Sequence, residues 1–279
     1  MTKSRSSNLY KVALTIAGGI LMAFLVLGPS NAAAQSKLKK FGEFSDEQTV
    51  SVDHSEWNRI LQAYIVELED ARTIFKYGDV TDADKKALSD YVNSLEAVDT
   101  SDLTKEQAYA YWVNFYNALT IEVVLDGYPV KSIKDLDIFK RGPWHQKLAK
   151  VRGVDLTLNN VEHDILRAHW SDPRTHYAVN CASYGCPNLQ AVAFTVENTD
   201  ELLTKGALEF INHERGIFVS DAGSVRASSI YKWYQVDFGD SDEKVLEHVR
   251  QYANDDLKAK LEGKTKIDSF EYGWLLNEE

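Results

Sequence analysis

The stretch Glu106-Gln-Ala-Tyr-Ala-Tyr-Trp-Val-Asn-Phe-Tyr-Asn-Ala-Leu-Thr-Ile-Glu-Val-Val-Leu125 decides the fold of this chain. At about 100° per residue, its apolar side chains fall on every side of a helix rather than on one stripe. A helix that is apolar all round is buried, so other elements must pack around it. Thr104 followed by Gln107 is a capping-box pattern that starts this helix, and Gly127-Tyr-Pro129 ends it.

Two amides interrupt this apolar helix. Asn114 and Asn117 are three residues apart, so they share one edge. A buried amide without hydrogen-bond partners costs about 1–3 kcal/mol. They either bond neighbouring backbone, which is the commoner case, or orient a loop or polarise a substrate. Together with Trp112 and Tyr116 of the same helix, we predict that they form part of a binding site.

The pattern over residues 157–170 predicts a second informative helix, closed by Asp172-Pro173. Projected at about 100° per residue, Glu162 falls inside the apolar arc and His163 on its rim. Sequence neighbours on a helix do not face each other, so no relay between these two side chains is expected. The acid has two interpretations: a functional group of a buried site, or a structural carboxylate that bonds an amide or an arginine.

The two cysteines of the chain lie in His176-Tyr-Ala-Val-Asn-Cys-Ala-Ser-Tyr-Gly-Cys-Pro-Asn-Leu189. This pattern predicts a short strand, His176 to Val179, that runs into a tight turn containing Gly185 and Pro187. A strand that ends in a turn is a place where a fold presents a side chain to a pocket. We therefore expect a functional site here.

The rest of the chain predicts helices joined to a few short strands. Helices are expected from Asp53 or Ser55 through Ile74 and over residues 82–95, 197–213, 230–238, 241–252 and 255–262; hairpins over 144–156 and 216–227; and a final strand over 266–272. The fold class is therefore α+β, mainly helical, with a small central antiparallel sheet and a helical N-terminal preface. We divide the chain into residues 1–34, a linker and preface over 35–100, and a core domain over 101–279.

The first 34 residues resemble a secretory signal peptide. A start with Lys3, Arg5 and Lys11 precedes an uncharged run from Val12 to Leu27, and Ala32-Ala33-Ala34 provides a small-residue cleavage site. Cleavage after Ala34 predicts a periplasmic or secreted protein without a stable membrane span. The alternative is an uncleaved inner-membrane anchor.

The net charge of −11 argues against nucleic acid and anionic lipid as partners, because an acidic surface repels both. Two cysteines are too few for a disulfide scaffold, so any bond between them serves a local purpose. No cofactor is indicated.

Three interpretations compete for the cysteines. In the first, Cys181 is a nucleophile, His163 or His176 its base, and Glu162 or an asparagine the orienting group. Backbone N–H groups of residues 182–185, or the side chains of Asn180 or Asn114, would stabilise an oxyanion.

In the second, Cys181 and Cys186 form a local disulfide, which their spacing through a turn permits. In the third, His176, the two cysteines and Glu162 or His163 bind zinc, but this spacing matches no common zinc pattern, and we predict no metal.

Several ordered motifs resemble the bacterial and plant domain-of-unknown-function family 547. They are Tyr111-Trp-Val-Asn-Phe-Tyr-Asn-Ala118, Leu156-Thr-Leu-Asn-Asn-Val-Glu-His-Asp-Ile-Leu-Arg167, the segment from Asp172 to Pro187, and Ile230-Tyr-Lys-Trp-Tyr234 with Asp237-Phe238. The family tends to end in Tyr-Asp-Trp-x-Leu-Asn, where this chain has Tyr272-Gly-Trp-Leu-Leu-Asn277. The resemblance implies the family and no settled activity.

From the residues we predict a cysteine-dependent hydrolase or acyl transferase acting on amide or ester bonds in the cell envelope. The alternative is a non-catalytic module that binds a small molecule or peptide, with a Cys181–Cys186 bond shaping its pocket. A structural role beside an envelope protein partner, docked on the helical preface, is a third hypothesis.

Overall fold

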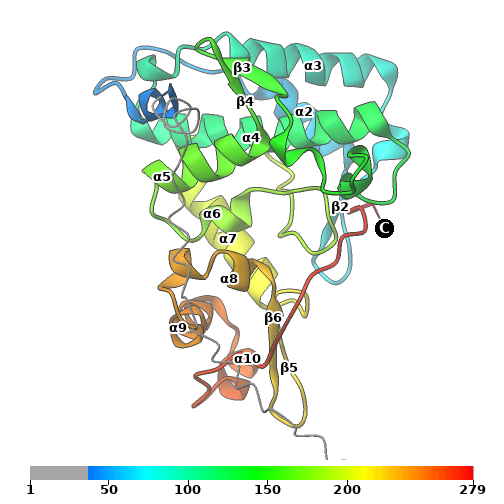
Figure 1. Ribbon diagram of the computed structural model, residues 1–279, viewed down its shortest axis with the longest axis vertical. Helices are drawn as coiled ribbons and strands as arrows, with labels where there is room; N and C mark the ends of the chain where they lie inside the picture. The colour runs from blue at the N-terminus through cyan, green and yellow to red at the C-terminus, as the bar shows by residue number, and fades with distance from the viewer. Residues whose placement is uncertain (1–36, 279) are drawn as a thin grey trace, which may run out of the picture.

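The computed structural model describes residues 37–278 (Figure 1). The predicted signal peptide and its cleavage site lie outside these residues. Among the helices of the described part, none combines the length and the apolar character needed to cross a membrane.

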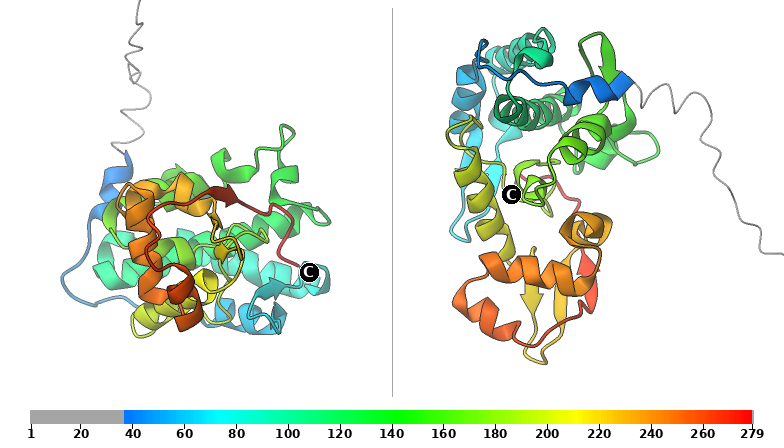
Figure 2. Two further views of the ribbon diagram at one scale, coloured as in Figure 1. Left: turned by 90° about the horizontal axis from the view of Figure 1, so that it is seen from below. Right: turned by 90° about the vertical axis from the view of Figure 1, so that its left-hand side faces the viewer.

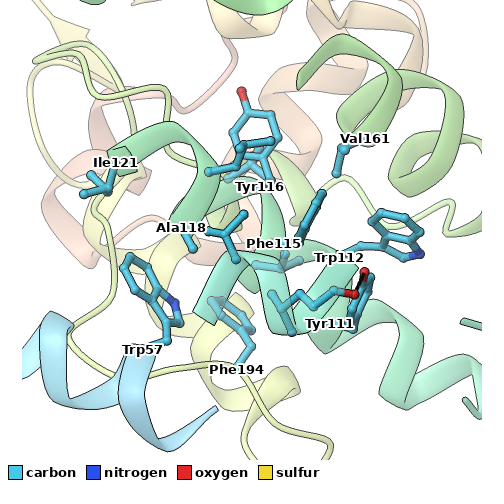
Figure 3. Close-up of a cluster of buried hydrophobic side chains, with 14 of the residues drawn as sticks. Trp57, Tyr111, Trp112, Phe115, Tyr116, Ala118, Ile121, Val161 and Phe194 are labelled. Carbon is cyan, nitrogen blue, oxygen red and sulfur yellow. Dashed lines mark hydrogen bonds between the residues drawn. The ribbon is translucent and has the colours of Figure 1, made fainter. Parts of the chain in front are cut away.

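The central helix is α4, Lys105–Gly127, and it forms as predicted. The Thr104 side chain accepts the Gln107 backbone N–H, and the Gln107 side chain in turn accepts the backbone N–H of Thr104. Helices α2 (Ser55–Tyr64) and α3 (Asp82–Glu96) pack beside it at the top of the molecule (Figure 1). The residues gathered around α4 form the upper core (Figure 3), which includes Trp57, Tyr111, Trp112, Phe115, Val161 and Phe194.

The preface is less helical than predicted. Its first helical turn, η1 (Lys39–Gly42), buries Phe41 against Trp112. The helix expected to reach Ile74 ends at Tyr64 instead, and a hairpin of β1 (Ile65–Glu67) and β2 (Thr73–Phe75) follows. The prediction was wrong because β2 is held by a distant segment: the Phe75 backbone N–H donates to the carbonyl of Asn277 at 2.9 Å.

The hairpin of β3 (Ala149–Val151) and β4 (Val154–Leu156) forms as predicted, with Arg152 and Gly153 at positive φ in its turn. The following helix is present but is largely a π-helix: η6 spans Asn160–Leu166 and continues into α5, Arg167–His169. Shorter helical turns connect the larger elements: η2 (Tyr77–Asp79), η3 (Thr100–Asp102), η4 (Ile133–Leu136) and η5 (Pro143–His145).

The strand predicted from His176 to Val179 is wrong: Thr175–Ala178 is a helical turn, α6. The Asp172 carboxylate accepts the Arg174 backbone N–H at 2.8 Å, and the Asp172 carbonyl accepts the backbone N–H of Thr175. Asp172-Pro173 therefore begins a helical turn here, since Asp caps helices and Pro suits their first turn. The four residues from His176 to Val179 include an aromatic and a β-branched side chain, and a run this short does not distinguish a strand from a helical turn.

A second core lies at the lower end of the molecule (Figures 1 and 2). It is built from elements close to those predicted: α7 (Thr199–Ile211), β5 (Ile217–Val219), β6 (Val225–Ser228), α8 (Ile230–Trp233), η7 (Gln235–Phe238), α9 (Asp242–Tyr252), α10 (Asp255–Lys260) and β7 (Ser269–Glu271).

The fold is α+β and mainly helical. Its strands are distributed over two hairpins and one three-stranded sheet, in which β6 pairs antiparallel with β5 and parallel with β7. After β7, the chain leaves the lower core and climbs along the molecule to reach β2 (Figure 1). We call residues 272–277 the C-terminal tail.

Candidate functional site

A cavity of about 560 Å³ lies where the upper core, the lower core and the C-terminal tail meet. Its floor contains Glu162, His176, Cys181 and Cys186. Aromatic side chains make up much of its wall: Tyr116 from α4, Trp144 from η5, Trp233 and Tyr234 at α8, and Tyr272 and Trp274 from the tail. Four of the six residues predicted as catalytic or disulfide-bonded thereby line one cavity, although they come from separate elements.

Both cysteines are free thiols that share one hydroxyl group. The Tyr272 Oη lies 3.0 Å from the Cys181 Sγ and 3.0 Å from the Cys186 Sγ. The Cys186 Sγ also accepts the backbone N–H of Cys181 at 3.0 Å. Tyr272 was not identified from the sequence, although it begins the terminal motif that the family resemblance singled out.

The surroundings favour the thiolate on Cys186. Burial raises the pKa of this thiol. Hydrogen bonds from Cys181, from Tyr272 and from backbone groups together lower it by more, so the pKa of Cys186 falls below its usual value. The pKa of Cys181 is raised well above its usual value by its hydrogen bond to Cys186, by burial and by the nearby charge. The phenol pKa of Tyr272 is raised by burial and by both sulfurs, so this residue remains a proton donor.

Asn117 and Asn180 hold the loop that carries the thiols. The Asn117 side chain donates to the Ala178 carbonyl at 2.9 Å and accepts the Asn180 backbone N–H at 2.8 Å. Asn180 in turn donates to the Pro187 carbonyl at 2.7 Å and accepts the Ala182 backbone N–H at 2.8 Å. Both amides orient the loop, and their hydrogen-bonding groups are engaged there rather than in the cavity.

Asn114 and Trp112 are placed away from the cavity. The Asn114 amide donates to the Phe194 carbonyl at 2.8 Å and accepts the Phe194 backbone N–H at 2.9 Å, which is the commoner role for a buried amide. Trp112 is fully buried among Phe41, Tyr111 and Phe115 in the upper core. Of the four residues predicted as a binding set, Tyr116 alone lines the cavity.

The predicted oxyanion donors in the cysteine turn are mostly occupied. The Tyr184 backbone N–H donates to the Leu275 carbonyl at 2.7 Å, and that of Gly185 donates to the Gly273 carbonyl at 2.8 Å. With the Ala182 N–H bound to Asn180, the turn uses these groups to hold the tail. This close approach requires glycine: a Cβ on Gly185 would lie 2.8 Å from the Gly273 nitrogen, and a Cβ on Gly273 would lie 2.7 Å from the Tyr184 ring.

Glu162 is buried on the cavity floor, as its place in the apolar arc predicted. The Tyr116 hydroxyl donates to its Oε2 at 3.0 Å, and Figure 3 shows this hydroxyl pointing away from the upper core. Tyr234 forms a second hydrogen bond to the carboxylate. The π-helical segment η6 places the acid at this point of the wall.

His176 lines the cavity as a member of a carboxylate–imidazole pair. Its Nε2 lies 2.6 Å from the Asp237 Oδ2, and its ring stacks on Tyr234 with centroids 4.3 Å apart. Arg167 binds the same carboxylate through two nitrogens. Burial raises the pKa of Asp237, but His176 and Arg167 lower it more, so the acid is ionised and fixes the imidazole.

His163 lies at the edge of the site, as predicted from its position on the helix rim. Its side chain is 30% exposed, and its Nδ1 is 3.7 Å from the Glu162 Oε1 and 3.3 Å from an Arg167 nitrogen. Burial lowers its pKa. It is not among the residues that line the cavity, so His176 is the better placed of the two predicted bases.

Within residues 37–278, no group of three or more histidine, cysteine, aspartate and glutamate side chains is arranged to hold a metal ion. The hydrogen bonds of the candidate ligands run to protein groups instead: His176 to Asp237, the thiols to Tyr272, and Glu162 to Tyr116.

The fold and the site define a mainly helical α+β protein in which a thiol pair and an imidazole bound to Asp237 line one aromatic-walled cavity. A family model described as "Protein of unknown function, DUF547" matches residues 100–211 and supports the resemblance of this part of the chain to that family. Searches of curated proteins and of solved structures gave no match. The matched segment contains α4, η6 and the cysteine loop, whereas Asp237 and Tyr272 come from the part of the chain that follows it.

Proposed function

We propose that the cavity is the active site of a cysteine-dependent hydrolase or acyl transferase that acts on an amide or ester bond of a small molecule or peptide. One observation carries this proposal: a thiol pair held by Tyr272 and an imidazole held by Asp237 line the same cavity. A nucleophile, a base and a group that orients the base are the parts that covalent acyl transfer needs.

The sequence suggested Cys181 as the nucleophile, but we assign this role to Cys186, because its surroundings lower its thiol pKa whereas those of Cys181 raise it. In the proposed reaction, His176 takes the proton of Cys186, and the thiolate attacks the substrate carbonyl carbon to form a carbon–sulfur bond. The protonated imidazole then gives its proton to the leaving nitrogen or oxygen as the carbonyl–heteroatom bond breaks. Water or another acceptor removes the acyl group from sulfur. Because the backbone N–H groups of the turn are engaged, the Tyr272 hydroxyl is the group proposed to donate to the oxyanion.

The test uses an activated ester, p-nitrophenyl acetate, and iodoacetamide on reduced protein. We expect an acetyl adduct on Cys186 that is absent from Cys186→Ser and that forms at least tenfold more slowly in His176→Ala, since general base catalysis typically contributes about 10²–10⁴-fold. Peptide mass mapping identifies the modified sulfur. Unchanged acylation in both variants, or acylation confined to sites outside the cavity, would rule the proposal out.

A second candidate is a non-catalytic binding module with a Cys181–Cys186 disulfide. The specific observation in its favour is that both sulfurs contact the same Tyr272 hydroxyl, while the backbone groups of their turn are engaged in holding the tail. Intact mass distinguishes the two functions: protein that is two hydrogens lighter before reduction and does not react with iodoacetamide supports the binding module.

We also propose that the protein is exported and processed after Ala34, because a basic start, an uncharged run and a small-residue site follow one another at its N-terminus. Mass spectrometry of protein recovered from the periplasm or medium tests this. A chain that retains residues 1–34 in the membrane fraction would favour the alternative of an uncleaved anchor.

A further inference from the structure

Glu162 is a buried acid whose hydrogen-bond partners are neutral. Its side chain is 8% exposed, and its hydrogen bonds come from the phenols of Tyr116 and Tyr234. Among residues 37–278, the basic group within ion-pair distance is His163 at 3.7 Å, and burial disfavours the charged form of that imidazole. Arg167, a guanidinium with an electrostatic effect on the acid, is already bound to Asp237.

A carboxylate in this position lacks the compensation that buried charges normally have. Burying an acid without a cationic partner is costly, and structural buried acids are generally paired. Glu162 differs from such acids in that it borders a cavity, where a ligand can supply the missing charge. The Cys186 thiolate, when formed, adds a second negative charge to the same floor.

The cavity wall also favours a cation. Trp144, Trp233, Tyr272 and Trp274 form a continuous group with neighbouring ring centroids 4.6–5.8 Å apart. The faces of aromatic rings attract ammonium groups, most strongly those of tryptophan. The Lys134 ammonium already lies over the Trp274 ring, 4.7 Å from its centroid, which shows that this wall accepts a cation.

The basic residues at the rim do not reverse this preference. Lys140 lies 3.4 Å from Asp135, and Arg141 lies 3.4 Å from Asp137, so their charges are balanced by neighbouring acids. The positive charges of Lys140 and Arg141 are thus largely compensated, and the Lys134 ammonium, which also lines the cavity, is held over the Trp274 ring. Glu162, by contrast, has no lysine or arginine within ion-pair distance among residues 37–278.

We propose that Glu162 is a specificity-determining residue that binds the ammonium group of the substrate, so that the substrate class is an amino acid amide or ester, or a peptide with a free amino terminus. This inference deepens the proposed function and rests on it, because it treats the bound molecule as the substrate of that reaction. The carboxylate accepts the ammonium hydrogens while the aromatic wall covers the neighbouring side chain.

The test measures binding without turnover. Tryptophan fluorescence of the reduced protein at about pH 6.5, where an α-amine is protonated, is titrated with phenylalaninamide and with N-acetylphenylalaninamide. The two probes share their ring and amide but differ in the ammonium. We expect the acetylated probe to bind about ten- to hundredfold more weakly, as for loss of a charged hydrogen bond.

Glu162→Gln should abolish this preference, because the amide still accepts from Tyr116 but has no charge. Glu122→Gln is the matched control: this partly buried acid lies on α4, outside the cavity, and the variant should keep the preference. Equal affinity of the wild-type protein for both probes, binding of neither, or a preference that persists in Glu162→Gln would overturn the proposal. Because no acylation is measured, these results are independent of the nucleophile test.

Discussion

At the scale of single residues, Tyr272 links the two halves of the candidate site. Its hydroxyl contacts both sulfurs, and its ring packs against Trp233 and Trp274 in the cavity wall. A phenol that stays protonated stabilises a thiolate by donating a hydrogen bond to it, so Tyr272 is placed to stabilise the proposed nucleophile.

Tyr272→Phe should therefore raise the pKa of the reactive thiol. Removing a hydrogen bond to a charged group costs about 1.5–3 kcal/mol, which corresponds to a rise of about one to two pH units. The pH profile of iodoacetamide labelling of reduced protein measures the shift. Tyr252→Phe, which removes a hydroxyl from the lower core, serves as the control. A profile identical to that of the wild-type protein would show that Tyr272 does not stabilise the thiolate.

His248 gives the protein a pH-dependent stability that is separate from catalysis. It is buried in the lower core, where its Nε2 lies 2.9 Å from the Tyr177 hydroxyl, and burial lowers its pKa to about 4. The unfolded chain, in which histidine has a pKa of about 6.5, binds the proton more readily between these values. The contribution of neutral His248 to the unfolding free energy is therefore fully present above about pH 6.5 and is lost as the pH falls to about 4.

This histidine should contribute about 3 kcal/mol to the decrease in unfolding free energy between pH 6.5 and 4. His54, whose pKa burial also lowers to about 4, should add a similar decrease. Urea unfolding across this range tests the prediction: His248→Gln should lose about half of the pH dependence, and His145→Gln, at an exposed position, none. Equal slopes in all three proteins would contradict it.

At the scale of elements, α4 both builds the core and positions the site. Most of its side chains are buried, yet three polar groups on it face neighbouring segments: Asn114 holds Phe194, Asn117 holds the cysteine loop, and Tyr116 holds Glu162. The helix is thus the rigid reference to which the loop and η6 are attached.

Asn117→Ala should destabilise the protein by about 2–4 kcal/mol, because it leaves the Ala178 carbonyl and the Asn180 N–H buried without their partner. It should also increase labelling of the cysteines by loosening their loop. Urea unfolding and iodoacetamide rates measure the two effects. Asn93→Ala, at an exposed position of α3, should be close to neutral. A loss below 1 kcal/mol for Asn117→Ala would show that the loop is held by other contacts.

At the scale of the whole molecule, the C-terminal tail joins the lower core to the upper core. After leaving β7 it binds the cysteine turn at Tyr184 and Gly185, and it ends at Asn277, which bonds Phe75 of β2 and the hydroxyl of Tyr77. The Asn277 backbone N–H also donates to the Ala182 carbonyl. The cavity is therefore complete only when the C-terminal tail has packed against the cysteine turn and β2, because Tyr272 and Trp274 of the tail form part of its wall.

Deleting residues 275–279 should lower the melting temperature by several degrees and accelerate labelling of Cys181, since the bonds at Tyr184, Phe75 and Ala182 are lost. Deleting residues 278–279 alone keeps Asn277 and these bonds, and should change neither quantity. Differential scanning calorimetry and labelling rates compare the two. If both truncated proteins behave as the full chain does, the tail is not a structural part of the site.

Local patterns predicted α3, α4, α9 and the β3–β4 hairpin closely, because capping residues, apolar periodicity and a turn with positive φ are encoded by neighbouring residues. They failed at β2, where the backbone is held by a distant segment, and at α6, where the apolar run was too short to separate a strand from a helical turn. They also placed Glu162 correctly on a buried face, although the helix that carries it is largely a π-helix.

The sequence by itself determined the α+β class, the buried central helix and the burial of Glu162, and it pointed to the cysteine loop that lines the candidate site. Only the tertiary structure decided how the side chains combine, because the deciding contacts join distant positions: Cys181 and Tyr272 are 91 residues apart, and His176 and Asp237 are 61 apart. Periodicity reports which face of an element is buried. It carries no information about which distant side chain that face meets, and this is set by the packing of the whole chain.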